Sequence, residues 1–418
     1  MDNKNINYDV IVIGGGASGM MAAGRAAERG KKVLLLEKNK ELGSKLKITG
    51  GGRCNVTNAE KDEKVLLTHY GEASVFLHSP FSQFGVKDTF SFFESRGLPL
   101  VIQANKRAFP KTEKAIDIFR VLDKYLKQGK VEIQTKTNVE NFEVDGGRIS
   151  AAVVNGKRMV ASSFILATGG KSHPETGSTG DGFSWLLKLG HTVKEPTPTI
   201  VPLAVQDEWI KKLAGVTLSA VRINFFLEGE RKMVLKGDIL CTHFGLSGPL
   251  ILNSAGDVAD LLHEGAVTAQ IDTHPQDDIG SLGKHITAVF DANKNKVLKN
   301  VWNEIAPTGT ANAILPLLKK VFPSTKVHSI TKDQRREIVD LLKALPVTIT
   351  GLMGYDRAVV ADGGLSLEEV DTRTMRSKLY TNLYITGDLL HISRPSGGYS
   401  LQLCWTTGYV AGSNVMIK

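Results

Sequence analysis

The first forty residues alternate between short apolar runs and one segment of small residues with helical character. YDVIVI, at 8–13, is apolar and rich in β-branched residues, as expected of a strand buried on both faces of a parallel sheet. MMAAGRAAERG, at 20–30, is rich in alanine and ends at a glycine, which predicts a helix. KKVLLLE, at 31–37, is a second apolar run. The chain therefore opens with a predicted βαβ unit.

The turn of this unit carries the pattern G-x-G-x-x-G at Gly14, Gly16 and Gly19. The first glycine permits a tight turn, the second lets the backbone approach a diphosphate, and the third lets helix and strand pack closely. Glu37 ends the second strand, where a carboxylate can accept both ribose hydroxyls of an adenosine and would repel a 2′-phosphate. The pattern predicts an ADP-containing dinucleotide other than NADP, and the spacing leaves FAD and NAD open.

A second glycine-rich stretch, LGSKLKITGGGRCNVTN at 42–58, directly follows the second strand. Three glycines at 50–52 would let the main chain press against a long cofactor. FAD, with its ribityl chain and three-ring flavin, needs such a surface more than NAD does, although an ordinary glycine-rich loop is the alternative. Cys54 has no cysteine close by in sequence, so a small buried residue is favoured over a redox pair.

Further patterns predict strands, turns and helices along the rest of the chain. The stretch 131–172 reads as strands joined by hairpin turns, and its last strand ends in the open turn ATGG. NLYITGDLLH, at 382–391, is an apolar strand ending in TGD, and two glycines at 397–398 precede a helix of small and apolar residues. Between these parts, 192–274 shows β patterns and 275–346 shows apolar positions three and four apart, which is typical of helices.

Composition narrows the class of protein. The chain has 418 residues, of which 42% are hydrophobic and 23% are charged, as in globular proteins of two or three domains. We expect no membrane span and no signal peptide, because no apolar run reaches the length of a spanning helix and the first ten residues are polar. The three cysteines are far apart, which suits a reducing cytoplasm, and the dispersed histidines predict no metal site.

The formal charge of +9 and the pI of about 9.2 allow two interpretations. One is an anionic partner such as nucleic acid, a membrane surface or a phosphate cofactor. The other is a solvated basic surface, which is favoured because the lysines are scattered and no run of five basic residues occurs. We therefore expect a small-molecule substrate and neither a nucleic-acid nor a membrane partner.

Four motifs, TGGGRCNVTN, ATGGKSHPETGSTGDG, THFGLSGP and TMRSKL, resemble those of the bacterial three-domain flavoproteins that include aminoacetone oxidase and 3-dehydro-bile-acid Δ4,6-reductase. The resemblance implies an α/β fold of the glutathione reductase type, with a Rossmann-like FAD-binding domain and two inserted parts. We expect the FAD-binding domain at 1–191 plus 347–418, a β-rich inserted domain at 192–274 and a helical one at 275–346.

The resemblance also implies the residues that contact the cofactor. These are Gly14, Gly16, Ser18, Gly19, Glu37, Lys38, Lys45, Gly51, Gly52, Arg53, Cys54, Asn55, Val139, Thr168, Gly169, Gly387, Asp388, Gly398, Tyr399 and Ser400. The chain departs from the family at three of the positions near the flavin: family members usually carry glutamate at Asp388, aspartate at His391 and asparagine at Ser400. These departures do not change the expectation of FAD as the cofactor. They mean that the substrate of a characterised family member cannot be assumed for this chain.

No catalytic base is assigned from the sequence. Lys45, Arg53, Arg107 and His391 are candidate groups on the substrate side, and each has a plainer role open to it, such as phosphate binding, surface charge or packing.

Three functions are left open. The first is an FAD-dependent oxidoreductase of a small organic molecule, either an oxidase or an ene-reductase supplied by free NAD(P)H. The second is a flavoenzyme acting on RNA, and the third is a non-catalytic flavin-binding redox sensor. No second strand-G-x-G-x-x-G-helix-acid set follows the first, so no built-in NAD(P)H domain is expected. The sequence sets neither the substrate nor the oligomeric state.

Overall fold

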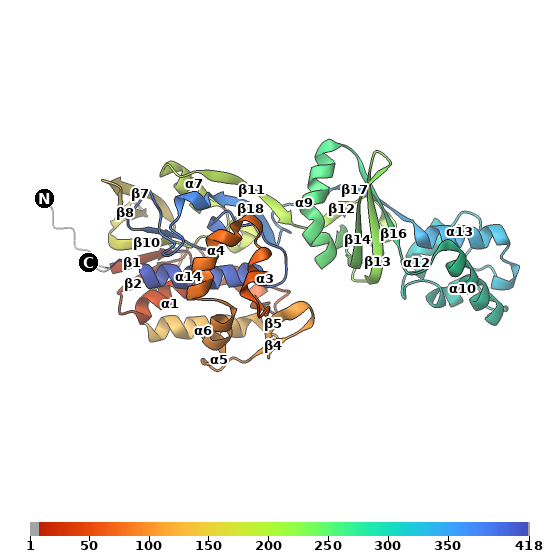
Figure 1. The fold of residues 1–418 in the computed structure, drawn as a ribbon, viewed down its shortest axis with the longest axis horizontal. Helices are drawn as coiled ribbons and strands as arrows, with labels where there is room; N and C mark the ends of the chain where they lie inside the picture. The colour runs from red at the N-terminus through yellow and green to blue at the C-terminus, as the bar shows by residue number, and fades with distance from the viewer. Residues whose placement is uncertain (1–7, 417–418) are drawn as a thin grey trace. The chain divides into compact units, whose positions relative to one another are not determined.

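A computed structural model describes residues 8–416, which divide into two compact units (Figure 1). The first unit combines both ends of the chain, up to Pro198 and from Val359, and the second is Thr199–Ala358. No helix among the described residues is long and apolar enough to cross a membrane.

The first unit is built on a five-stranded parallel sheet in the order β19-β10-β1-β2-β6. The strands are β1 (Tyr8–Ile13), β2 (Val33–Leu36), β6 (Glu132–Gln134), β10 (Ala161–Leu166) and β19 (Leu383–Ile385). Every residue of β2 and β10 is buried, as continuous apolar runs predict for a sheet covered on both faces. The expected α/β class with a Rossmann-type sheet is confirmed.

Two helices from opposite ends of the chain pack against each other beside this sheet. α1 (Ala17–Glu28) and α14 (Tyr399–Asn414) approach so closely that a Cβ on Gly408 would lie 2.4 Å from the Ser18 carbonyl oxygen. A Cβ on Gly412 would be equally close to the carbonyl of Ala22, at 2.4 Å. The other helices of this unit are α2 (Ser44–Ile48), α3 (Glu63–Thr68), α4 (Ser74–Gln83), α5 (Val86–Glu94), α6 (Ala115–Gln128) and α7 (Asp181–Lys188).

Three small sheets complete the first unit. They are β3-β5-β4, the antiparallel β7-β8-β9 and the pair β11-β18. The predicted turns at 145–147 and 155–156 join the strands of the second sheet. The strands are β3 (Thr57–Asn58), β4 (Leu100–Ile102), β5 (Arg107–Pro110), β7 (Val139–Asp145), β8 (Arg148–Val154), β9 (Lys157–Met159), β11 (Val193–Ile200) and β18 (Val360–Leu365).

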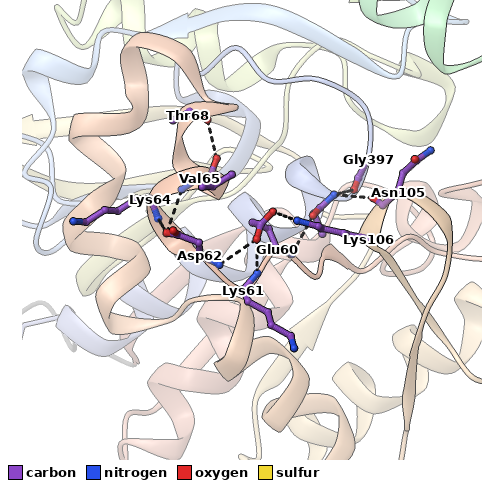
Figure 2. A network of polar contacts seen from close by, with 10 residues as sticks. Glu60, Lys61, Asp62, Lys64, Val65, Thr68, Asn105, Lys106 and Gly397 are labelled. Atoms are coloured by element: carbon purple, nitrogen blue, oxygen red, sulfur yellow. Dashed lines mark hydrogen bonds and ion pairs between the residues drawn. The ribbon is translucent and has the colours of Figure 1, made fainter. Parts of the chain in front are cut away.

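A polar network fixes the chain that leaves the second glycine-rich stretch (Figure 2). The Glu60 carboxylate accepts hydrogen bonds from the amides of Lys61, at 2.9 Å, and Asp62, at 3.2 Å, and forms an ion pair with Lys106. Asp62 in turn caps α3 by accepting from the Lys64 amide at 2.9 Å. The network joins the start of α3 to the turn before β5.

The same region is tied to the loop that precedes α14. The Asn58 side-chain amide donates to the carbonyls of Asn105 and Gly397, each at 3.3 Å (Figure 2). Gly398 has a φ of +104°, and a Cβ there would lie 2.4 Å from the Thr57 carbonyl carbon. Gly398 therefore serves a close contact between two backbone segments.

The second unit is a closed six-stranded barrel with helices. The barrel order is β12-β15-β14-β13-β16-β17, and one hydrophobic cluster includes residues of both the barrel and the helices. The strands are β12 (Leu203–Val205), β13 (Thr217–Leu227), β14 (Glu230–Cys241), β15 (Gly245–Ser247), β16 (Val267–Asp272) and β17 (Leu345–Leu352). The helices are α8 (Glu208–Lys211), α9 (Pro249–Glu264), α10 (Ile279–Ala292), α11 (Leu298–Val301), α12 (Ala311–Ile314) and α13 (Lys332–Lys343).

The division into two units differs from the three domains that the sequence suggests. β17 follows the helices in sequence but pairs with β12 and β16, so the barrel closes only after the helical segment. The expected domain boundary at 346/347 falls inside this strand. In the sequence, the boundary between the two compact units lies at 358/359. The β-rich and helical parts also share one hydrophobic core.

Candidate functional site

A cavity of about 420 Å³ lies in the first unit, where the central parallel strands end. Its wall includes Ile13 and Leu36, which are the last residues of β1 and β2, and Ala167, which follows β10. Ligands of open α/β sheets bind at this edge, outside the carboxyl ends of the strands.

The glycines of the first turn have three different physical roles. Gly14 has a φ of +104°, and a Cβ there would lie 2.5 Å from the Ala167 carbonyl oxygen. A Cβ on Gly19 would lie 1.9 Å from the carbonyl oxygen of Gly14. Gly16 is different: its φ of −81° suits any residue, and a Cβ would have no protein atom within 4 Å. The fold therefore requires the first and third glycines, while the second keeps space open in the cavity wall.

The cavity also receives the start of α1. This helix begins at Ala17 without a side-chain cap, and Gly16, Ala17 and Ser18 line the cavity. The first N–H groups of a helix carry partial positive charge, so this end suits a phosphate. Nearby, the Thr168 hydroxyl is buried and has no hydrogen-bond partner among the described residues. The amides at the start of α1 and the Thr168 hydroxyl are therefore donors available to a ligand in the cavity.

Glu37 is buried at the end of β2 and is held by main-chain donors. Its two carboxylate oxygens accept from the amides of Gly15 and Asn39, each at 2.8 Å. Each oxygen keeps a second lone pair, so the fixed carboxylate can still accept from hydroxyl groups in the cavity.

A second charged group, the Asp388 carboxylate, faces the cavity from the short helix η8 (Gly387–Leu389). The buried Arg394 guanidinium pairs with it, and donates to the Ser400 hydroxyl at 3.0 Å and to the Ile392 carbonyl at 2.6 Å. Arg394 therefore fixes the carboxylate, a partner that sequence patterns did not reveal. The available signal was one arginine in the loop after η8, which contains no carboxylate of its own.

Lys45 projects from α2 into the same cavity, where its ammonium donates to the Ser172 hydroxyl at 3.2 Å. Burial lowers the pKa of Lys45, while the charge of Asp388 acts in the opposite direction. Cys404 lies beside both groups, and burial raises the pKa of its thiol to about 12. This thiol therefore stays protonated near neutral pH.

Lys45 differs from the other cationic side chains of the wall. Lys38 pairs with Asp181 at 2.6 Å, and His173 contacts Glu175 at 2.8 Å. Within the part of the chain that the structure describes, no carboxylate lies within 4.0 Å of the Lys45 ammonium. A partly buried cation without a counter-ion is a site for a negatively charged or electron-rich group.

Many of the cofactor contacts expected from sequence line this one cavity. They are Gly14, Gly16, Ser18, Glu37, Lys38, Lys45, Gly51, Val139, Thr168, Gly169, Asp388 and Ser400. The others lie outside its wall: Gly19, Gly52, Arg53, Cys54, Asn55, Gly387, Gly398 and Tyr399. The wall also contains residues that the sequence patterns did not predict, among them Asn39, Ser44, Thr49, His173, Ser178, Thr179, Asp181, Trp185 and Cys404.

Three of the four catalytic candidates also lie outside the wall. Arg53 pairs with Glu113 at 2.6 Å and stacks its guanidinium 4.5 Å from the Phe109 ring centre. Arg107 lies in β5, and His391 lies beyond η8, where burial lowers the pKa of its imidazole. Only Lys45 faces the cavity.

A second constellation has the geometry of a nucleophile, base and acid. His191 lies 2.7 Å from the Glu369 carboxylate through Nδ1 and 3.1 Å from the Ser377 hydroxyl through Nε2. However, Ser377 is only 2% exposed and its oxygen already accepts from the amides of Leu379 and Tyr380, each at 3.0 Å. It lines no described cavity, so the three residues form an internal tether rather than a reactive centre.

Comparison with known proteins shows the family of this chain. The family model described as HI0933-like protein Rossmann domain matches residues 8–414. The chain belongs to this HI0933-like family. It is 31% identical over 407 residues to a 3-dehydro-bile acid delta(4,6)-reductase of Clostridium scindens, covering 96% of this chain and 97% of the relative. It is 25% identical over 412 residues to a ribosomal RNA dihydrouridine synthase of Escherichia coli, covering 98% of each chain.

Solved structures show the same fold. A 3-ketosteroid-delta4-(5alpha)-dehydrogenase from Rhodococcus jostii RHA1 aligns with a TM-score of 0.53 and 15% identity, covering 97% of this chain and 96% of that one. These comparisons confirm the expected family and the expected class of FAD-dependent oxidoreductase.

Removing the partner of Asp388 tests whether Arg394 holds this wall. Arg394→Met would leave a partly buried carboxylate without its cation, so we expect the free energy of unfolding to fall by about 3 kcal/mol. Urea unfolding of the apoprotein measures this. The control is Arg158→Met, because the Arg158–Glu143 pair, at 2.7 Å, is largely exposed and its loss should change little. Equal effects of both variants would contradict the anchoring role.

Proposed function

We propose that the cavity of the first unit holds FAD and that the enzyme reduces a carbon–carbon double bond conjugated to a carbonyl in a small organic molecule. One observation carries the proposal. Two kinds of relative that span nearly this whole chain are named for such a reduction, one of a 3-oxo bile acid with Δ4,6 double bonds and one that forms dihydrouridine. In uridine, the 5,6 double bond is conjugated to a ring carbonyl, so the two substrates share their reacting group.

The empty space at Gly16, the uncapped start of α1 and the Thr168 hydroxyl fit an ADP-containing cofactor. In this proposal the α1 amides bind the diphosphate and Glu37 accepts from the adenosine ribose. Asp388, fixed by Arg394, accepts from ribityl hydroxyls. When bound, FAD supplies hydride transfer through its flavin ring.

The reduction needs a hydride for one carbon and a proton for its neighbour. Lys45 carries a proton at Nζ, and burial makes that proton easier to lose than in an ordinary lysine. Its unpaired charge can also hold a phosphate or a substrate oxygen. Cys404 stays a thiol, so a thiolate step has no support in this wall. We propose free NAD(P)H as the electron donor.

A second candidate function is reduction of uridine in RNA, favoured by identities of 25% and 24% to ribosomal RNA dihydrouridine synthases over 98% and 97% of this chain. The small-molecule proposal ranks first because the bile acid reductase is 31% identical over a similar length.

The decisive experiment is anaerobic mixing of chemically reduced holoenzyme with a steroid 4-en-3-one, a simple cyclic enone or the matching saturated ketone. We expect the oxidised flavin spectrum to return with an enone, together with a product that has gained two hydrogens, and not with the saturated ketone. Reoxidation by oxygen alone would indicate an oxidase. A flavin that no donor reduces and no enone reoxidises would indicate a sensor.

Gly16→Leu should exclude FAD from the cavity without harming the fold. A Cβ at this position has no protein atom within 4 Å, and the rest of the leucine side chain would extend into ligand space, so we expect FAD affinity to fall about a hundredfold or more, as for the loss of two charge-assisted hydrogen bonds. Titration of FAD into apoprotein measures the affinity, and the melting temperature of the apoprotein should match that of the wild type. Full flavin content in this variant would argue against the proposed position of the diphosphate.

Lys45→Met tests the unpaired cation through pH. Protonated Lys45 attracts the anionic cofactor, so FAD affinity should fall as pH rises through the lowered pKa of Lys45. We expect the variant to bind about tenfold more weakly at pH 7 and to lose this pH dependence. Lys38→Met is the control, because Lys38 is already paired with Asp181 and its loss should leave the profile in place. An unchanged profile in Lys45→Met would remove the assigned role.

A further inference from the structure

Two segments of the helical part of the second unit, 294–299 and 322–328, lie side by side. Val297 and Lys326 form an antiparallel bridge, and the Lys299 amide donates to a carbonyl of the other segment at 3.0 Å. The first segment carries three lysines and the second carries Lys326, with Lys319 and Lys320 shortly before it in sequence; both segments lie in the part of the chain between α10 and α13 in Figure 1. Backbone pairing therefore gathers lysines that the sequence separates by about thirty positions.

Six lysines stand in this region, three within 294–299, two at 319–320 and one at 326. All are exposed, and in the described range 8–416 none of them forms an ion pair. The lysine surface consists of Lys294, Lys296, Lys299, Lys319, Lys320 and Lys326. The nearby Glu337 carboxylate accepts from the main-chain amides of Lys319 and Lys320, at 2.8 and 3.0 Å, so it is held by backbone donors. The Glu304 carboxylate accepts from the Asn293 side-chain amide at 3.1 Å, next to Lys294 in sequence, and forms no ion pair with a lysine of the described residues.

An aromatic side chain stands in the same loop. Phe322 is 72% exposed, a large apolar area for a protein to leave in water, and it lies between Lys320 and Lys326 in sequence. Proteins that bind single-stranded nucleic acid combine a positive surface for phosphates with exposed aromatic rings on which bases stack. The lysine surface and Phe322 supply these two elements together.

We propose that this surface binds single-stranded RNA. The charge of six exposed lysines without ion-pair partners among the described residues complements a phosphate backbone, the exposed ring offers a base a stacking partner, and full-length relatives are named for acting on ribosomal RNA. The inference does not rest on the proposed reduction, because RNA binding can be measured without turnover. It also reverses the expectation of no nucleic-acid partner, which considered only runs of basic residues along the sequence.

Fluorescence anisotropy of the full-length holoprotein with a labelled single-stranded RNA, across a series of salt concentrations, tests the proposal. With all six lysines engaged, log K against log salt should have a slope of about −4. The triple variant Lys296→Gln, Lys299→Gln and Lys326→Gln should reduce the steepness of this slope by about 2. Phe322→Ala should weaken binding about fivefold or more while leaving the slope unchanged.

The matched control replaces three exposed cations elsewhere in the same unit, one after α8 and two in β14, by Lys212→Gln, Arg231→Gln and Lys236→Gln. It removes the same charge and should leave most of the affinity and the slope. Equal effects of the two triple variants would show that net charge alone drives binding and would overturn the proposal. So would the absence of RNA binding at low salt, or binding of heparin that matches RNA with no contribution from Phe322.

Discussion

The site depends on how closely backbone segments approach one another around the first turn. Gly14 and Gly19 have no room for a Cβ, because the carbonyls of Ala167 and Gly14 lie 2.5 and 1.9 Å from where it would stand. Gly408 lets α14 approach the start of α1 in the same way. These contacts set the start of α1 against the ends of the parallel strands, so that its free N–H groups line the cavity.

Nearly every ionised side chain in the cavity wall already has a partner within the protein. Asp388 is bound by Arg394, Lys38 by Asp181 and Glu37 by main-chain amides. Groups fixed in this way are ready to accept or donate without reorganising when a ligand arrives. Lys45 alone among the wall's cations lacks a carboxylate partner in the described chain, and this makes it the group whose charge a ligand would satisfy.

The parts of this account that local patterns determine could be predicted from sequence. The strands around 8–13 and 31–37, the glycine turn and the carboxylate at Glu37 all depend on short-range periodicity and spacing. The role of Arg394 could not be predicted, because side-chain pairing within an irregular loop has no periodic signal. The closure of the barrel by β17 was missed for a related reason, since strand pairing across a helical segment depends on the tertiary fold. The lysine surface likewise exists only once two distant segments pair.

The central claim is that the cavity binds FAD through its ADP half, at the start of α1 and Glu37. Calorimetric titration of the apoprotein with FAD and, separately, with FMN tests this most directly, because FMN carries the flavin but lacks the adenosine. Loss of the hydrogen bonds to the ribose and to the second phosphate predicts that FMN binds about a hundredfold more weakly than FAD, or less well still. FMN binding as tightly as FAD, or no flavin binding at all, would contradict the account.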